Sequence, residues 1–246
     1  MGTGTDAGTG TYAARLCRTH GRAASFLDDG VGATSMRPRP PLPTLRAMEP
    51  SSDRPRVLPA HRYRRERWKN QRGWTREIAR APSDGDWDWR LSIAEIEEDA
   101  PFSRFDGIER ELVLLSGNGL RLRFDDGAVH ALLPPHERLR FAGERAVSGE
   151  LIDGPTQDFN LMWRREAIDA HLWHRPLVGP MVMFVEPGSV WGVHLLAGQA
   201  RFADASGLPD LATADTALLV AQHDARERFV LDGGGEVLLV RLQRRG

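Results

Sequence analysis

The chain has 246 residues, enough for one large domain or two small ones. Apolar residues make up 41% and charged residues 27%, as in an ordinary globular protein. The formal net charge of -1 gives no overall attraction to nucleic acid or to an anionic membrane, and no run approaches the roughly 20 apolar residues that span a bilayer.

Residue usage adds two constraints. All basic residues except Lys69 are arginine, which is typical of codon bias in a GC-rich genome, so arginine clusters carry little functional weight. Cys17 is the only cysteine and cannot form an internal disulfide, so no oxidising compartment is required. Because the N-terminus lacks an apolar signal core, we expect a cytoplasmic protein.

Residues 1–55 are expected to be a disordered extension. They contain Gly-Thr repeats and the proline-rich run Arg37–Pro43, a composition that buries too little apolar surface to offset the entropy of ordering. The repeats follow no predicted strand, so they do not indicate a phosphate loop. We expect Met48 to be the natural start and the upstream part to be mis-annotated. A transit peptide is the alternative.

Short β-like runs follow from residue 56 onward. Trp87–Ile96 and Leu120–Phe124 alternate apolar and polar residues, and Glu111–Leu115 does so less cleanly. Asp125-Asp126-Gly127 is typical of a hairpin turn leading into Ala128–Leu133. Strands at this spacing favour a β-sandwich or barrel. The best candidate for a helical turn is Phe105–Arg110.

The two halves of the chain share a weak internal repeat. Leu114–Gly117 opens a predicted hairpin, and Leu195–Phe202 resembles it. Each is followed by a turn and a further apolar strand, and Glu236–Leu242 closes the second half. This pattern predicts a duplicated β-barrel unit, with one half at residues 56–165 and the other at 166–246.

Three motif segments have a distinctive order and spacing. They are Trp68–Ile78, then Trp89–Ala94 with Pro101–Arg110, and finally Phe141–Glu144 with Asp153–Met162. Together they resemble the HutD family, which includes the Ves proteins. The first resembles the family's Trp-x-Asn-small-x-Gly-x-Thr-Arg-Glu-Ile opening. The second resembles its Trp-Arg-x-Ser-Ile-Ala and Phe-Ser-x-Phe-x-Gly-x-x-Arg pair, and the third its Asp-Phe-Asn-x-Met signature.

The resemblance fades after residue 165. The sequence also differs from the family pattern at one point, because Gln71 and Arg72 stand where the family usually has small or glycine residues. The resemblance implies an all-β bicupin, meaning two antiparallel barrel or jelly-roll halves. It also implies an accessory or regulatory protein of histidine utilisation that binds urocanate or formylglutamate, both small carboxylates. The Ves branch shares the same motifs, so membership does not settle the pathway.

A metal or a catalytic nucleophile is not predicted. Metal cupins use closely spaced histidines on one strand, but His171 and His174 would point to opposite faces, and Arg110 and Glu111 stand where the first ligands would be. The histidines are expected at surface or hydrogen-bonded positions, and no cofactor is expected. Cys17 lies in the expected extension, and there is no Gly-x-Ser-x-Gly motif.

A polar set that is unusual for a barrel interior remains. Alternation places Arg90 and Ser92 on one strand face, and Asp158 and Asn160 on another. An arginine fork beside amide and hydroxyl groups is suited to a carboxylate, whereas Glu77 and Asp158 could orient the arginines or meet a cationic part of the ligand. The expected ligand-binding residues are Asn70, Thr75, Glu77, Arg90, Ser92, Phe102, Ser103, Phe105, Arg110, Asp158, Asn160 and Met162.

Several alternatives stay open. The charged residues could form a buried ion-pair network that only fixes the barrel, and Phe102, Phe105 and Phe159 could be core residues. An enzyme could use Glu77 or Asp158 as general base on a small carboxylate. A Ves-like protein without a ligand is a third hypothesis. The arginine-rich run 62–76 could suggest RNA binding, but because the net charge is close to neutral we expect no nucleic-acid partner and no membrane partner. A homodimer is a further open alternative.

Overall fold

A computed structural model describes residues 54–245. Apart from two short 3-10 turns, Ala60–Arg62 and Asp204–Ser206, the regular structure in this part of the chain is all β-strand. No helix in these residues is long and apolar enough to cross a membrane. The expected extension, Cys17 and the possible start at Met48 lie outside the described residues.

The first half of the described chain forms two antiparallel sheets, here called sheet B and sheet C. Sheet B has the order β2 (Arg64–Arg67), β3 (Gly73–Ala81), β4 (Trp89–Ile96), β11 (Thr156–Arg164), β6 (Ile108–Ser116) and β9 (Arg138–Ala142). Sheet C has the order β5 (Ala100–Pro101), β10 (Val147–Leu151), β7 (Leu120–Phe124) and β8 (Val129–Leu132).

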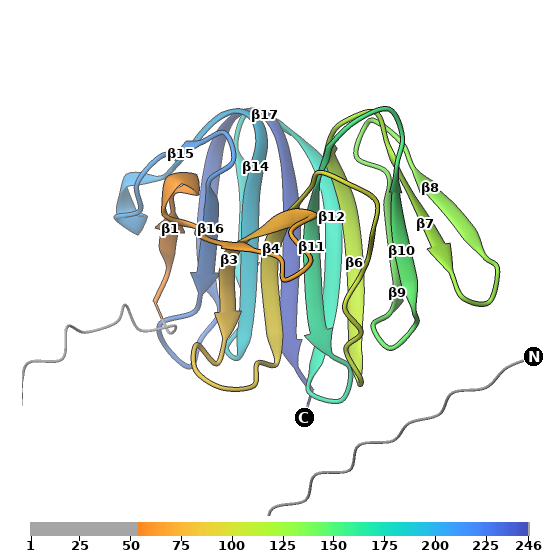
Figure 1. Cartoon of the computed structure of the whole chain (residues 1–246). Helices are drawn as coiled ribbons and strands as arrows, with labels where there is room; N and C mark the ends of the chain where they lie inside the picture. The colour runs from red at the N-terminus through yellow and green to blue at the C-terminus, as the bar shows by residue number, and fades with distance from the viewer. Residues whose placement is uncertain (1–53, 246) are drawn as a thin grey trace, which may run out of the picture. The chain divides into compact units, whose positions relative to one another are not determined.

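The second half forms sheet A, which has seven strands (Figure 1). Its main order is β1 (Arg56–Leu58), β16 (Thr216–Val220), β14 (Ser189–Phe202), β17 (Glu227–Arg244) and β12 (Ile168–Val178). In addition, β13 (Met181–Val185) pairs with β17, and β15 (Leu211–Ala212) pairs with β14. The predicted boundary after residue 165 falls in the turn between β11 and β12, but β1 joins the sheet of the second half.

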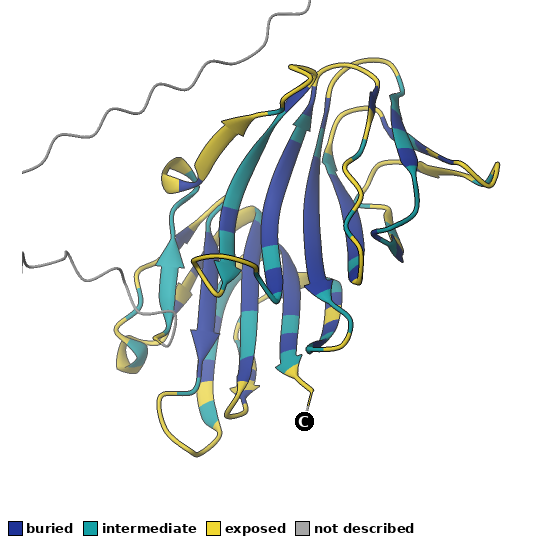
Figure 2. Ribbon diagram, turned by 60° about the horizontal axis from the view of Figure 1, so that its bottom comes forward, coloured by how far each residue is buried: buried dark blue, intermediate teal, exposed yellow. Residues whose placement is uncertain are grey.

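Three apolar clusters hold these sheets together. One lies between sheets B and C and contains Leu112, Leu122 and Phe124. A second lies within the curled sheet A, and the third joins sheet B to sheet A through residues such as Phe159 and Val240. Sheet B is therefore covered on both faces, and its central strands are the most continuously buried in Figure 2.

Alternation along sheet B sorts its side chains between these clusters. In β4, Leu91 and Ile93 pack toward sheet A, whereas Ala94 and Ile96 pack toward sheet C. The same period of two places Phe159 and Leu161 of β11 on the sheet A side. The polar residues between them, which include Ser92 and Asn160, consequently face the space between sheets B and C.

Strands β14 and β17 pair over most of their length, and their backbones approach so closely at one point that both residues there must be glycine. Gly198 and Gly235 pair in register, both have positive φ angles, and a Cβ atom on either would lie 1.9 Å from a backbone oxygen of the opposite strand. A register shift lies beside them, between Leu195 and Ala197. Glycine therefore allows these two strands to approach and bend here.

The predicted turns and the predicted helix had different outcomes. The Asp125-Asp126-Gly127 hairpin is confirmed, since it joins β7 to β8 with the Phe124 N–H donating to the Ala128 carbonyl. The helical turn at Phe105–Arg110 is wrong, because β6 begins at Ile108 and pairs with β11 and β9. Sheet pairing of these residues outweighs their weak helical signal.

The predicted match between the two hairpins of the internal repeat is partly wrong. Gly117 ends β6 in a turn, but the matching Gly198 lies inside β14, where the chain makes a bulge and continues to Phe202. Both glycines have a positive φ angle. Gly117 lies in a turn after its strand, whereas Gly198 lies in a strand that bends and continues.

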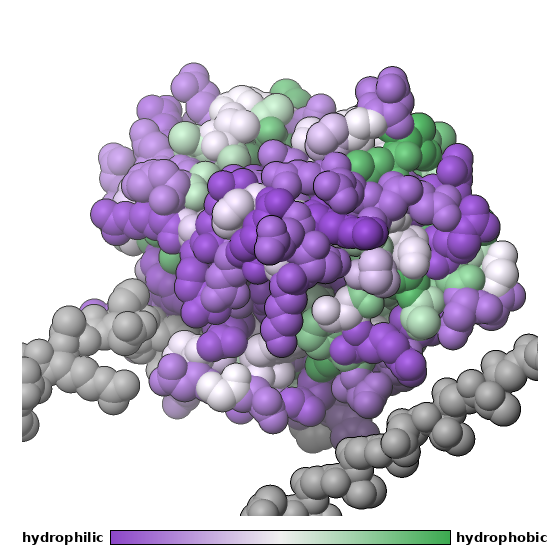
Figure 3. Space-filling view, viewed as in Figure 1, coloured by the Kyte–Doolittle hydropathy of each residue, from purple (hydrophilic) through white to green (hydrophobic). Residues whose placement is uncertain are grey.

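The arginine-rich run is largely neutralised by glutamates. Arg65 and Arg76 pair with Glu95, and Arg67 pairs with Glu97. Figure 3 shows that the face carrying β2 and β3 is mostly hydrophilic, with small, separate hydrophobic areas. Mixed charges of this kind do not provide the uninterrupted positive surface that phosphate backbones attract.

Candidate functional site

A cavity of about 460 Å³ lies on the sheet C side of sheet B. Its volume is in the range typical of small-molecule sites. Eleven of the twelve expected ligand-binding residues line it, namely Asn70, Thr75, Arg90, Ser92, Phe102, Ser103, Phe105, Arg110, Asp158, Asn160 and Met162. Only Glu77 is not part of the lining.

Strand register sets the order of these side chains. Met162 of β11 pairs with Arg90 on β4 and with Arg110 on β6. Two residues earlier, Asn160 pairs with Ser92, and then Asp158 pairs with Ala94. The two arginines thus share one row of the cavity wall, and Asp158 lies two rows away, beside the apolar cluster between sheets B and C.

Arg110 is a buried cation whose charge is not neutralised by a carboxylate at ion-pair distance in residues 54–245. It is 5% exposed, its Nη1 donates to the Ser103 carbonyl at 3.3 Å, and its Nε has no hydrogen-bond partner. Its guanidinium lies 5.2 to 5.7 Å from the ring centres of Phe102, Phe105 and Phe141.

Burial, aided by the nearby charge of Arg90, lowers the pKa of Arg110 to about 10, so the group stays protonated at neutral pH. A buried charge without a counterion is costly unless something binds it. The environment of Arg110 therefore favours an anion in the cavity.

Arg90 differs from Arg110 in having a protein carboxylate. Its Nε donates to Glu77 Oε2 at 2.8 Å, and Glu77 also lies within 4 Å of Arg64 and Arg80. Glu77 therefore holds Arg90 in place from outside the cavity lining, as one of the two roles expected for this residue.

Asp158 and Asn160 supply unsatisfied oxygens. Asp158 is fully buried and accepts one hydrogen bond, from the Thr156 hydroxyl at 3.2 Å, and its Oδ1 has no partner. The Asn160 Oδ1 also lacks a partner. Burial raises the pKa of Asp158 to about 7, against the opposing effect of the Thr156 bond. At neutral pH this carboxyl group can therefore donate or accept a hydrogen bond.

The remaining wall is aromatic on one side and charged at the β2–β3 hairpin. Trp68 packs edge-on to Phe102, and its Nε1 donates to Thr75 Oγ1 at 2.9 Å. Glu66, Arg67 and Lys69 also line the cavity. None of these four residues was among the expected ligand-binding residues, although the Trp-x-Asn motif contains Trp68 and Lys69 and was an available signal for them.

Among the described residues, no histidine or cysteine lines the cavity. His194, expected at a hydrogen-bonded position, is buried in sheet A with Nδ1 2.9 Å from Thr216 Oγ1. The donors in the cavity are guanidinium, amide, hydroxyl and carboxyl groups, which are suited to an organic anion. Elsewhere, His136, His174 and Glu236 come together, a grouping that the sequence analysis did not predict.

Comparison with known proteins places these features in a family. The model of the HutD family matches residues 60–239. An uncharacterized 21.2 kDa protein in the hutC 3' region of Pseudomonas putida is 42% identical over 118 residues, covering 47% of this chain and 62% of that protein. Protein Ves of Cronobacter sakazakii is 39% identical over 106 residues, covering 43% and 58%. The chain thus spans less than two thirds of the length of these curated relatives.

Solved structures extend the similarity to both halves. HutD from Pseudomonas fluorescens SBW25, in a structure described as a formate condition, is 31% identical with a TM-score of 0.68. This match covers 78% of the chain and 100% of that protein. Because the family match spans most of the chain and the structural match spans all of the HutD structure, the protein belongs to the HutD/Ves family and has its all-β, cupin-like fold.

Proposed function

We propose that the cavity binds a small carboxylate and that the protein is a cytoplasmic accessory or regulatory protein of histidine utilisation rather than an enzyme. The relation to HutD and to a protein of the hutC region supports the pathway. The observation that carries the proposed ligand is Arg110, a buried guanidinium in the cavity with an unpaired Nε and no neighbouring carboxylate among the described residues.

Arg110 would hold the ligand carboxylate through its planar N–H groups. Charge-assisted, two-point hydrogen bonding is the strongest way for arginine to recognise a carboxylate. The aromatic rings of Phe102 and Phe105 fix the guanidinium and exclude water from one side. Because water is limited there, the electrostatic attraction would be stronger than at an exposed arginine.

The other end of the ligand would meet Asn160 and Asp158. Both have a buried oxygen that accepts no hydrogen bond from the protein, so a ligand N–H or O–H would satisfy it. An imidazole N–H, as in urocanate, or an amide N–H, as in formylglutamate, has this chemistry. The separation of Arg110 from Asp158 by two rows of sheet B favours a ligand with a carboxylate at one end and a donor at the other.

We also propose that the two halves are two cupin units, with only the first one forming this site. The space between sheets B and C contains the cavity, whereas the corresponding space within sheet A is filled by an apolar cluster that includes Phe202, Phe229 and Leu239. The second half would thus serve mainly as support for sheet B.

A second candidate function is acid–base catalysis on the same carboxylate. The favouring observation is that Asp158 lines the cavity, has an unpaired Oδ1 and has a pKa that burial raises to about 7. Incubating the protein with urocanate and formylglutamate and following both by NMR would detect turnover. Turnover that disappears in Asp158→Asn would favour the enzyme over the binding protein.

The binding proposal is tested by isothermal titration and thermal unfolding with formate, urocanate, formylglutamate, glutamate and histidine. A ligand at 100 times its dissociation constant stabilises a protein by roughly 2.7 kcal/mol, which raises the Tm of a chain of this size by about 5–10 °C. We expect such a shift with urocanate or formylglutamate and a smaller one with formate.

Arg110→Ala should remove this shift. Arg123→Ala is the matched control, because Arg123 lies on β7, is exposed and pairs with Glu150 outside the cavity. Binding that survives Arg110→Ala, or that is lost equally in Arg123→Ala, would refute the assignment of the site. If none of the carboxylates shifts the wild-type Tm, the proposed ligand class is wrong.

A further inference from the structure

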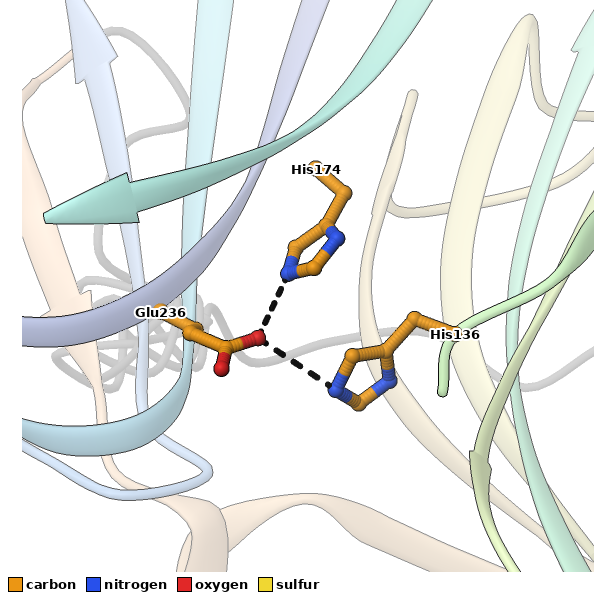
Figure 4. A group of neighbouring side chains, drawn as sticks. All are labelled: His136, His174 and Glu236. Atoms are coloured by element: carbon orange, nitrogen blue, oxygen red, sulfur yellow. Dashed lines mark hydrogen bonds and ion pairs between the residues drawn. The ribbon is translucent and has the colours of Figure 1, made fainter. Parts of the chain in front are cut away.

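Three metal-binding side chains from distant segments converge away from the carboxylate cavity (Figure 4). His136 lies in the turn between β8 and β9, His174 on β12, and Glu236 on β17. One ligand atom from each lies within 4.8 Å of the other two. None of the three lines the cavity, so this cluster is separate from the proposed carboxylate site.

The hydrogen bond of His136 determines which of its ring nitrogens is free. Its Nδ1 lies 3.0 Å from the Leu114 carbonyl oxygen, which can only accept, so Nδ1 carries the proton in the neutral ring. The Nε2 atom then presents a lone pair, and it lies 3.7 Å from Glu236 Oε2. A carbonyl that orients the far nitrogen of a histidine is the usual outer partner in a metal site.

The Glu236 carboxylate lies near the Nε2 atoms of both imidazole rings. The Glu236 Oε2 atom also lies 2.7 Å from His174 Nε2, so all three ligand atoms point toward one region (Figure 4). The two imidazole rings meet edge to face with centroids 4.9 Å apart, which leaves both Nε2 atoms directed to the carboxylate. A metal ion at this point could accept a lone pair from each imidazole and from the carboxylate.

We propose that His136, His174 and Glu236 bind a divalent transition-metal ion, for which zinc is the best match. Two imidazole nitrogens and one carboxylate oxygen suit zinc and its neighbours, whereas calcium and magnesium prefer all-oxygen ligands. Ligand bonds near 2.0–2.1 Å in a tetrahedron place the ligand atoms about 3.3 Å apart. The separations of 2.7 and 3.7 Å lie on either side of this value, so small side-chain rotations complete the site.

The ion would keep coordination positions open to water and would also link the two halves of the chain. The side chains of His174 and Glu236 are 35% and 45% exposed, so water can supply the remaining ligands. Because His136 belongs to the first half and the other two ligands to sheet A, the metal would join the two halves on their outer side. No histidine pair here is close in sequence, which is why motif spacing gave no indication of the site.

The test uses the full chain, stripped of metal with a chelator and titrated with Zn²⁺ and Co²⁺. Calorimetry should show one tight site, and bound Co²⁺ should give the visible absorption of a low-coordinate complex. His174→Ala should lower the affinity at least roughly 100-fold, since loss of an outer partner alone costs 10- to 100-fold. Glu236→Gln, an exposed and nearly isosteric change, should lower it at least roughly tenfold.

His171→Ala is the matched control. His171 lies on the same strand, is exposed and pairs with Asp169, so its loss should leave the affinity unchanged. The proposal is overturned if the wild type binds neither ion, or if Glu236→Gln and His174→Ala bind as tightly as the wild type. Neither result would bear on the carboxylate site, whose residues are different.

Discussion

Arg90 and Arg110 flank the same residue, Met162, from opposite sides in sheet B, but only Arg90 has a protein carboxylate as partner. Glu77 neutralises Arg90, whereas Arg110 is surrounded by Phe102, Phe105 and Phe141. The cavity wall therefore keeps an uncompensated positive charge beside a neutralised one. A buried arginine that served only stability would be expected to have a carboxylate partner, so this asymmetry supports the proposal of an anion site.

Replacing Arg110 with methionine should separate the ligand-binding role from a structural one. Methionine is a long, flexible side chain without a charge. Replacing a whole buried ion pair by apolar residues is often neutral or stabilising by 1–4 kcal/mol, and a buried charge without a counterion has even less Coulombic energy to lose. We expect Arg110→Met to raise the free energy of unfolding by about 1 kcal/mol in urea titration and to abolish carboxylate binding.

The alternative of a purely structural network predicts the opposite sign. If Arg110 were half of an essential buried ion pair, its removal would cost about 3–5 kcal/mol. Glu77→Gln is the useful comparison, because Glu77 does have arginine partners. A loss of several kcal/mol in Arg110→Met would leave the structural reading in place.

Asp158 should make the free protein less stable as the pH rises. Its pKa is raised from 3.8 to about 7, so the folded protein holds a proton that the unfolded chain has released. The free energy of unfolding should fall between pH 4 and pH 7, by about 4 kcal/mol for this group, and be constant above. Urea unfolding at several pH values measures this, and Asp158→Asn should lack the fall.

His194 should have the opposite dependence. Burial lowers its pKa from 6.5 to about 3, so the unfolded chain takes up a proton that the folded protein excludes. The contribution of the neutral ring is present above pH 6.5 and is lost as the pH falls toward 3. His194→Gln, which can keep a bond to Thr216, should unfold with a weaker acid dependence than the wild type. If the variant loses stability at acid pH as steeply as the wild type, the pKa of His194 is not lowered by folding.

Sequence patterning was sufficient for the central strands of sheet B and for the part of the cavity wall that they form, because both depend on a period of two. Once Leu91 and Phe159 pack toward sheet A, Ser92 and Asn160 must face the other side. The motif residues then come together because β4, β6 and β11 are neighbours.

Contacts between remote segments could not be read in the same way. Tyr63 donates to Thr216 or accepts from it across the two halves at 2.7 Å, and nothing near either residue predicts this. Likewise His136 lies in a turn of the first half and meets Glu236 in the middle of β17, one hundred residues further along the chain. Glu77 was expected among the ligand-binding residues, but it lies outside the cavity lining and accepts a hydrogen bond from Arg90.

The β2–β3 turn offers a gain in stability at Gln71. This residue has a φ of 61° in a turn beside the cavity, where the HutD motif favours a small residue or glycine. A left-handed backbone costs a residue with a Cβ atom roughly 1–2 kcal/mol, partly offset by the greater freedom of glycine in the unfolded chain. Gln71→Gly should therefore raise the free energy of unfolding by about 0.5–1 kcal/mol.

Gln71→Ala is the control that isolates the backbone effect. It removes the same side chain but keeps the Cβ atom, and the bond from Arg67 to the Gln71 carbonyl oxygen is available in both variants. If alanine stabilises as much as glycine in urea unfolding, the side chain and not the left-handed backbone is the source of strain. If only glycine stabilises, the strain lies in the left-handed backbone of Gln71, and the rest of sheet B holds the turn in its shape. Carboxylate binding by the neighbouring Lys69 and Asn70 should then be unchanged.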